Sequence, residues 1–353
     1  MNKRFQARFG ALMLLLAAIL LTSAQVGQRV TATTGASPAA SASSQLAALP
    51  ASDFIIFVDT QRLVADTLPN FLAGDQALLS KVNAKLDRFQ KECGVDPRSF
   101  DSLAIGLRFP ATGTGHDMRF AAIAHGRFVA SDLIEAGFAT AKTRENIGRE
   151  EQVYEGKKIF VLTSARDRAA AEDGPTAKTE RADARRMAVA ELDGSTIVMG
   201  DLESVRATLN QSMARVDQGL VDLATRNSNA VASFAGNLPP SLARGFGFGN
   251  GKAAKLASSV RQVYGSASTA GTEAQTLVAA RTENAEQAQD IAQAINGLKL
   301  LSKFGIGGRG SSKAQAEALS SLLNNLTITS QGNEVEFKLN VTQQEIAPLM
   351  RNF

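Results

Sequence analysis

Cysteine, histidine and tyrosine are scarce in this chain of 353 residues, and tryptophan is absent. It has one cysteine, two histidines, two tyrosines and no tryptophan. The single cysteine, Cys93, excludes an intrachain disulfide, so the hydrophobic core must stabilise the fold. The cysteine and the histidines, His116 and His125, do not have a metal-ligand spacing. The shortage of Trp and Tyr also argues against a surface that stacks nucleic-acid bases.

The charge of the chain gives no indication of a nucleic-acid partner either. The chain has 38 Lys and Arg against 34 Asp and Glu. Residues 1–24 hold three of the basic residues and no acidic residue, and removing them leaves 35 basic residues against 34 acidic ones. The remainder is nearly neutral, so the calculated pI of 9.2 does not indicate a basic binding surface.

Residues 1–24 have the pattern of a signal peptide. A basic start at Lys3, Arg4 and Arg8 precedes an apolar run, Ala11–Leu21, and a small residue, Ala24, stands where cleavage is expected. The run has 11 residues, whereas a membrane-spanning helix needs about 20. We predict export to the periplasm or the outside of the cell. If the signal is not cleaved, residues 1–24 supply the only membrane contact, as an anchor in the inner membrane.

The segment that follows the signal is rich in small and polar residues. Residues 25–48 consist mainly of Ala, Ser, Thr and Gln, and they show no periodic apolar face. Such a composition is typical of chains that bury too little apolar surface to fold. We predict a disordered linker over residues 25–48.

The rest of the chain gives the same order of strand and helix signals twice. The clearest repeat is a hairpin at Ala188–Met199 followed by a helix that Asp201 opens, which matches a hairpin at Leu326–Leu339 followed by a helix that Thr342 opens. Alternating apolar residues in these strands indicate sheets that are buried on one side. The repeat predicts an internal duplication.

The predicted fold class is α+β, with two related modules of antiparallel sheet that carry helices on one face. Module 1 covers residues 49–215 and module 2 covers residues 228–353. Residues 165–185, within module 1, are highly charged without an apolar face, and we predict a mobile loop there. Whether the two modules share one sheet stays open at this stage.

Local signals place several elements of module 1. Phe54–Val58 is typical of a buried strand. Residues 75–93 predict a helix that Asp75 caps and Gly94 ends, with an apolar stripe of residues three and four apart. Glu155 and Gly156 predict the turn of a second hairpin.

Two glycine-rich strings resemble nucleotide-binding motifs. Gly305, Gly307 and Gly310 have the spacing of the dinucleotide fingerprint, which requires a strand before it and a helix after it. Residues 295–304 instead continue a helical pattern, so an interhelix loop is favoured. Gly251 and Lys252 lack the hydroxyl residue of a phosphate loop, since Ala253 follows them. We therefore assign no cofactor and no cofactor-binding residue.

The potential nucleophile and bases also have simpler explanations. Cys93 could pair with His116 or His125, but it continues the apolar stripe of its helix, where a buried thiol is common. We expect His125, near a strand end, to be a surface or edge residue. No catalytic residue and no metal ligand is assigned.

Two pairs of carboxylates remain as the basis of a hydrolase hypothesis. Glu191 and Asp193 flank a hairpin turn, and Asp53 and Asp59 bracket the first strand. Two acids held a few ångströms apart could hydrolyse a glycosidic bond. Asp193 is explained equally well by the chemistry of a hairpin turn.

The start of the folded part resembles a group of uncharacterised exported bacterial proteins whose mature part opens on an L-P-A-D-like motif and an apolar strand. The resemblance rests on Leu49–Val58, on Gly94–Pro97 and on Gly332–Val335. It implies bacterial export and a repeated architecture. The group has no assigned activity, so it implies no catalytic residue.

These observations favour an exported, non-enzymatic envelope protein that binds a protein or an apolar partner such as a lipid. The aliphatic helix faces could line a surface for such a ligand, although core packing gives the same pattern. The alternatives are a carboxylate-dependent hydrolase and a membrane-anchored structural protein.

Overall fold

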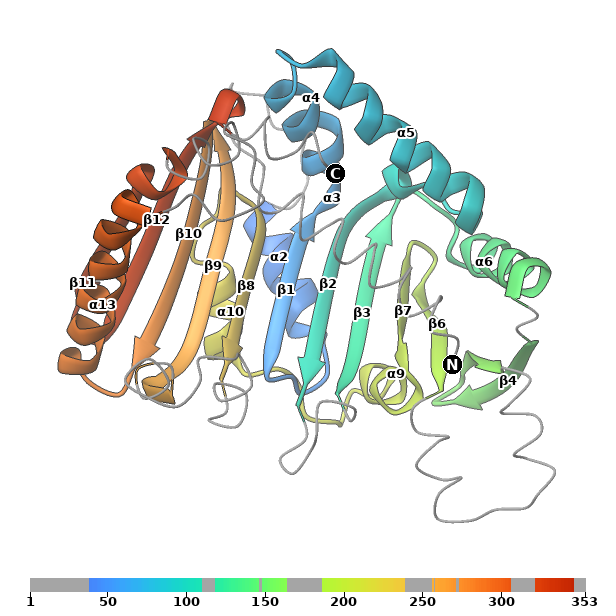
Figure 1. Cartoon of the computed structure of the whole chain (residues 1–353). Coiled ribbons are helices and arrows are strands. Elements are labelled where there is room, and N and C mark those ends of the chain that lie inside the picture. Colours follow the sequence, from blue (N-terminus) through green and yellow to red (C-terminus); the bar gives the residue numbers. More distant parts are fainter. Residues whose placement is uncertain are drawn as a thin grey trace. The chain divides into compact units, whose positions relative to one another are not determined.

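The computed structural model describes residues 38–109, 118–145, 148–163, 186–238, 256, 258–270, 273–305 and 321–345. They form helices and antiparallel strands (Figure 1), which confirms the α+β class. Two compact units result: unit 1 has residues 38–65 and 80–222, and unit 2 has residues 66–79 and 223–345. The predicted signal peptide (1–24) and mobile loop (165–185) lie outside the described residues.

Unit 1 contains an antiparallel sheet in which the second hairpin is inserted at one edge. Its strands follow the order β1-β2-β3-β7-β6-β5-β4. Each neighbouring pair is antiparallel. The strands are β1 (Phe54–Asp59), β2 (Phe100–Arg108), β3 (Arg119–Gly126), β4 (Gly148–Tyr154), β5 (Lys157–Thr163), β6 (Met187–Asp193) and β7 (Thr196–Asp201).

The helices between residues 38 and 224 vary widely in length. A continuous helical stretch after β1 contains α3, a π-helical turn and α4, and a short 3-10 turn precedes β2. The bounds are α2 (Pro38–Ala47), α3 (Thr60–Arg62), the π turn (Leu63–Thr67), α4 (Leu68–Phe71), α5 (Gln76–Cys93), the 3-10 turn (Pro97–Ser99), α6 (Ala130–Glu145), α9 (Leu202–Leu209) and α10 (Gln218–Ala224).

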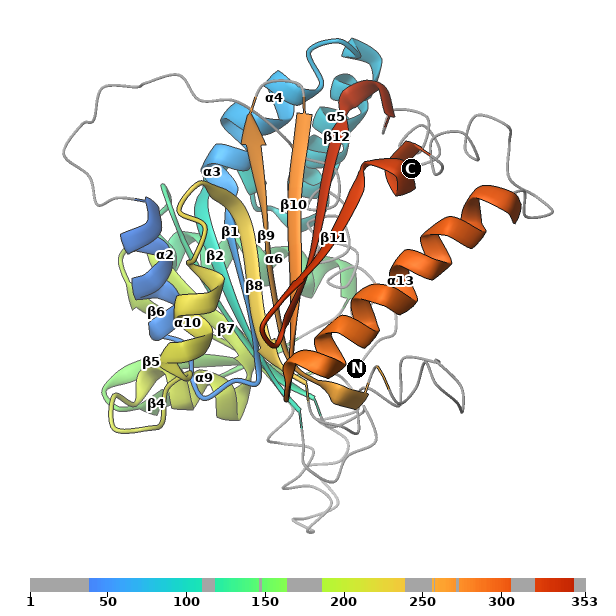
Figure 2. The same cartoon turned by 90° about the vertical axis from the view of Figure 1, so that its left-hand side faces the viewer.

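In unit 2 the strands follow the order β8-β9-β10-β12-β11, and each neighbouring pair is antiparallel. The long helix α13 packs along β11, β12 and β10 (Figure 2). The bounds are β8 (Ala230–Asn237), β9 (Val260–Ala270), β10 (Glu273–Thr282), α13 (Ala285–Gly305), β11 (Leu326–Gln331) and β12 (Glu334–Thr342).

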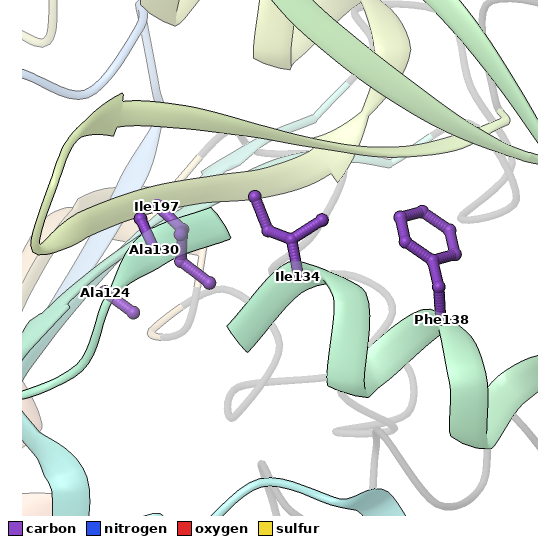
Figure 3. Close-up of a cluster of buried hydrophobic side chains, with 5 residues drawn as sticks. All are labelled: Ala124, Ala130, Ile134, Phe138 and Ile197. Atoms are coloured by element: carbon purple, nitrogen blue, oxygen red, sulfur yellow. The ribbon is translucent and has the colours of Figure 1, made fainter. Parts of the chain in front are cut away.

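Helix α6 and the sheet of unit 1 form a hydrophobic core (Figure 3). Ile134 and Phe138 of α6 point toward the sheet, where they meet Ala124 and Ile197. The four side chains are 4–9% exposed. Residues four apart on a helix lie one above the other, so Ile134 and Phe138 bury the same stripe. Helix α6 is thus held on the sheet by an apolar contact.

Helix α13 makes the corresponding contact in unit 2. Ala288, Ile291 and Ala292 cluster with Val335 of β12, which is fully buried. Small alanine side chains let the helix approach the sheet closely, and Ile291 fills the space between them.

Several local predictions for the turns and helix ends are confirmed. Asp75 accepts a hydrogen bond from the Leu78 N–H, and Gly94 ends α5 with a φ of 73°. Glu155 and Gly156 form the predicted turn, with φ values of 50° and 73°. Asp201 caps α9 through the Ser204 N–H at 2.9 Å.

The prediction of a disordered linker over residues 25–48 is wrong for Pro38–Ala47, which form helix α2. Leu46 is fully buried and Ala42 is 7% exposed, so two residues four apart dock the helix. Gln45 Nε2 also donates to Ser102 Oγ of β2 at 2.7 Å. The segment lacks a long apolar stripe, but one buried leucine and a tertiary hydrogen bond are enough to place it.

Arg215 fastens the end of α2 to the end of α9. Its guanidinium donates to the carbonyl of Ala48 at 3.0 Å and to the carbonyls of Thr208 and Asn210 at 3.2 Å. These carbonyls follow or close helices, where backbone acceptors lack intrahelical partners. One cation thus satisfies acceptors from two helix ends.

No helix within the described ranges is both long enough and apolar enough to cross a membrane.

The docking of α2 predicts a stability loss when Leu46 is truncated. Because Leu46 is fully buried, we expect Leu46→Ala to lower the free energy of unfolding by about 2–5 kcal/mol. Ser44→Ala, at an exposed position of the same helix, should change it by less than about 0.5 kcal/mol. Urea unfolding followed by circular dichroism measures both. Equal stability of the two variants would show that α2 is not docked in solution.

Candidate functional site

A row of apolar side chains crosses six strands of the unit 1 sheet on one face. Residues directly opposite each other in antiparallel strands lie on the same face. The register of five neighbouring strand pairs therefore places six side chains in one line across the sheet. This apolar row consists, in spatial order, of Ile56, Ile105, Ala122, Met199, Val189 and Phe160.

The row is only partly covered by the rest of the protein. Val189 and Phe160 pack against the α6 cluster, at the β5 end of the row. Ile105 and Ala122 are 4% and 1% exposed. Ile56 and Met199 keep an intermediate exposure, as do Val189 and Phe160. Four apolar side chains of this row therefore retain contact with solvent.

The guanidinium group of Arg149 borders the row at its β5 end. The guanidinium carbon of Arg149 lies 5.4 Å from the ring centre of Phe138 and 5.2 Å from that of Phe160. Arg149 also pairs with Glu135 of α6. Its charge is already balanced by this carboxylate, so the surface here is apolar with a neutral ion pair at its margin.

His125 lies beside the turn between β6 and β7. Its Nδ1 atom is 3.0 Å from Thr196 Oγ1 and 3.4 Å from Ser195 Oγ. His125 was expected to be a surface or edge residue. It does not lie on an edge strand, because β3 is paired on both sides, with β2 and β7, but its side chain is only partly buried and reaches the surface.

The group around His125 does not have the geometry of a Ser–His–Asp triad. In a triad the carboxylate holds one ring nitrogen of the histidine while the other faces the serine. Ser195 instead donates to Asp193 Oδ1 from its N–H at 2.9 Å and from its hydroxyl at 3.1 Å. Asp193 thus closes the hairpin turn, as the turn chemistry predicts.

The two acids that bracket β1 have separate structural roles. Asp53 accepts a hydrogen bond from the Phe109 N–H at 2.8 Å, and Asp59 accepts one from the Arg62 N–H at 2.9 Å. They lie at opposite ends of the strand, a separation of about 20 Å at about 3.3 Å per residue. A glycosidase pair must lie within about 10 Å, so these two cannot form one.

Glu191 and Asp193 lie near the β6–β7 turn and do not provide a general acid. Glu191 is exposed. Partial burial opposes ionisation of Asp193, but hydrogen bonds from Ser195 and Thr196 hold its pKa below the usual value. A general acid at neutral pH needs a raised pKa. Within the part of the chain that the structure describes, every carboxyl with a shifted pKa is lowered: Glu150, Asp193, Glu283, Glu334 and Glu345.

The other sequence candidates do not converge on a site. Cys93 is the last residue of α5. Gly305 ends helix α13, so the strand that the dinucleotide fingerprint requires before it is replaced by a helix. His116, Gly251, Lys252, Gly307 and Gly310 lie outside the described residues. Among the described residues no group of three or more His, Cys, Asp or Glu could hold a metal ion.

A polar cluster in unit 2 was not found from the sequence. Tyr264 of β9, only 2% exposed, donates from its hydroxyl to Glu334 Oε1 at 2.9 Å. Arg281 Nε donates to the same carboxylate oxygen at 2.6 Å, and Arg226 Nη1 donates to the Tyr264 hydroxyl. We call these four residues the Tyr264 cluster.

The register explains how the Tyr264 cluster assembles. Arg281 and Glu334 stand directly opposite each other in β10 and β12, and Tyr264 joins them from β9. The residues are up to 108 positions apart in the chain. Tyr264 is one of only two tyrosines, which was the one sequence signal that could have drawn attention to it.

No family model matches the sequence, and no curated protein matches it. Solved structures give matches to crystal forms III, I and IV of TP0453, with TM-scores of 0.45, 0.41 and 0.42. The identities are 9%, 8% and 8%, the matches cover 86–87% of this chain, and they cover 98%, 96% and 95% of those chains. At these scores the likeness carries no argument about fold or function.

The environment of Tyr264 predicts a late tyrosine titration. Burial of the phenol, with the hydrogen bond to the Glu334 carboxylate, raises the pKa of Tyr264 from 10.0 to about 12. In Tyr154→Phe, where Tyr264 is the remaining tyrosine, ultraviolet absorbance should therefore show a midpoint near 12.

The raised pKa also fixes the sign of a stability change. The neutral phenol stabilises the fold fully below pH 10, and this contribution is lost as the pH rises toward 12. Adding Glu334→Gln to Tyr154→Phe should bring the midpoint down, because the charge that opposes ionisation is gone. A midpoint at the ordinary value in Tyr154→Phe would contradict the burial of the phenol.

Proposed function

We propose that this chain is an exported, non-enzymatic protein of the cell envelope that binds an apolar partner, and specifically an acyl chain, on the apolar row. The observation that carries the proposal is that four side chains of the row remain partly exposed, although the row has no polar member. Apolar surface in contact with water favours binding by about 25 cal/mol for each Å² that a ligand covers.

The shape of the surface supports an acyl chain over a polar ligand. The row runs across six strands, and neighbouring strands lie about 4.8 Å apart, so its length is about 24 Å. An extended chain of aliphatic carbons fits such a line, since it needs no hydrogen-bond partner. Ligand surfaces of this kind are mainly apolar, with few polar groups.

We further propose that the two units descend from one duplicated module, each with helices on one face of its sheet. The proposal is supported by strand order, which is β1-β2-β3-β7-β6 in unit 1 and β8-β9-β10-β12-β11 in unit 2. In both units the third strand is followed by the helix that packs on the sheet, α6 or α13. The β4–β5 hairpin is then an insertion in unit 1.

The two alternatives have less support. A carboxylate-dependent hydrolase needs two acids that face each other, whereas Asp53 and Asp59 lie at opposite ends of β1. A membrane-anchored structural protein requires that residues 1–24 stay attached. Neither alternative gives a use for the partly exposed apolar row.

Replacing one exposed member of the row tests the proposed ligand. We expect Met199→Gln to weaken binding of a fluorescent 16-carbon fatty acid by about tenfold or more, because it puts a polar amide where the chain must make apolar contact. The matched control is Met213→Gln, since Met213 is 48% exposed and lies outside the row. Titration of the mature protein gives both affinities.

A second variant guards against a general loss of structure. Val189→Thr keeps the side-chain shape but replaces one methyl group with a hydroxyl, and it should also weaken binding while leaving the far-ultraviolet spectrum unchanged. Equal affinity of Met199→Gln and Met213→Gln would overturn the assignment. Tight binding of a purified envelope protein, without fatty-acid binding, would move the function to protein recognition.

A further inference from the structure

The Tyr264 cluster carries one positive charge more than its carboxylate can balance. Arg226 and Arg281 both approach Glu334 Oε1, at 3.5 and 2.6 Å. The neighbouring acid, Glu336, is paired with Lys338 at 2.7 Å. Tyr264 is neutral at physiological pH because its pKa is raised to about 12. Two guanidinium groups thus share one carboxylate.

The guanidinium groups have donors to spare. Arg281 uses Nε on Glu334, and within the described residues its two terminal nitrogens have no acceptor. Arg226 uses Nη1, on Tyr264 and Glu334, and leaves Nη2 and Nε without an acceptor in the same part of the chain. The side chains of Arg226 and Arg281 are 52% and 34% exposed, so an anion can reach them from solvent.

The tyrosine ring holds both cations in place. The guanidinium carbons of Arg226 and Arg281 lie 5.4 and 5.6 Å from the centre of the Tyr264 ring. This distance is within the range of cation–π attraction. Because the ring is buried in the sheet, the donors are ordered before a ligand arrives, which lowers the entropy cost of binding.

We propose that Arg226 and Arg281 bind the carboxylate group of a small ligand or of a peptide C-terminus. A single negative charge balances the excess of the cluster, whereas a phosphate dianion would exceed it. A planar carboxylate also matches the fork of a guanidinium group, which can donate two parallel hydrogen bonds. The site belongs to unit 2 and is independent of the apolar row.

The fluorescence of Tyr264 can report ligand binding at this site, because tyrosine and tryptophan are scarce in the chain. The protein has no tryptophan and only two tyrosines. In Tyr154→Phe, all tyrosine fluorescence therefore comes from Tyr264, whose hydroxyl is bonded within the cluster. Sodium acetate is added to this variant at constant ionic strength, with sodium chloride as the balancing salt. We expect a saturable change in emission that chloride alone does not produce.

Removing one guanidinium should weaken the acetate affinity. In the Tyr154→Phe background, Arg281→Gln should lower it by about tenfold, the usual effect of losing a charge-assisted hydrogen bond. Arg281→Lys keeps the charge without the fork and should lose less. Arg261→Gln is the matched control, because Arg261 lies on β9 and already donates to Glu283 from Nε at 2.9 Å and from Nη2 at 2.6 Å.

The source of the carboxylate is distinguished by two peptides. A short peptide with a free C-terminus should compete with acetate, while the same peptide with an amidated C-terminus should not. If acetate binds and neither peptide displaces it, the site accepts only small acids. A non-saturable acetate response, equal affinity in Arg281→Gln and Arg261→Gln, or binding of phosphate without acetate would each overturn the proposal.

Discussion

The antiparallel register is the constraint on which both units depend. Side chains alternate between the two faces of a strand, so a shift of one residue would move every apolar side chain to the opposite face. In unit 1 the register aligns Ile56, Met199 and Phe160 on one face. In unit 2 it sets Arg281 opposite Glu334. The apolar row and the Tyr264 cluster are thus two consequences of the same rule.

The helices cover only part of the apolar face that the register creates in unit 1. Ile134 and Phe138 cover the sheet of unit 1 near β7, but Ile56 at the other end of the row keeps solvent contact. A buried polar group is stabilised by hydrogen-bond partners, and Asp201 has several. Asp201, 6% exposed, accepts from the N–H groups of Phe120 and Ser204 and from the Ser204 hydroxyl. These three hydrogen bonds fix the junction of β7 and α9.

The elements that the sequence reveals are those with a local physical cause. Phe54–Val58 is apolar along its length and forms β1, and Asp201 opens α9 as an N-cap because its carboxylate can reach the next backbone amides. Helix α2 has no such signal. Its alanines favour helix, but a helix of 10 residues is marginal on its own, and Leu46 stabilises it only when a sheet is present to bury it.

The candidate sites were hidden for a similar reason. The members of the Tyr264 cluster lie far apart in the chain. Their meeting depends on the pairing of β9, β10 and β12, and on a contact between Arg226 and Glu334, which are 108 positions apart. The apolar row draws its members from six strands. Composition and spacing predicted sheets with an apolar side, but the side chains left uncovered depend on where each helix ends.

The contact between Arg215 and Ala48 also constrains the order of events during synthesis. These residues are 167 positions apart, so α2 cannot complete its docking until most of unit 1 has left the ribosome. Helix α2 also packs on β1 and β2, which are made earlier, so the Arg215 contact is a late addition to this docking. The C-terminal end of α2 is therefore secured only after the strands that the rest of the helix covers have been made.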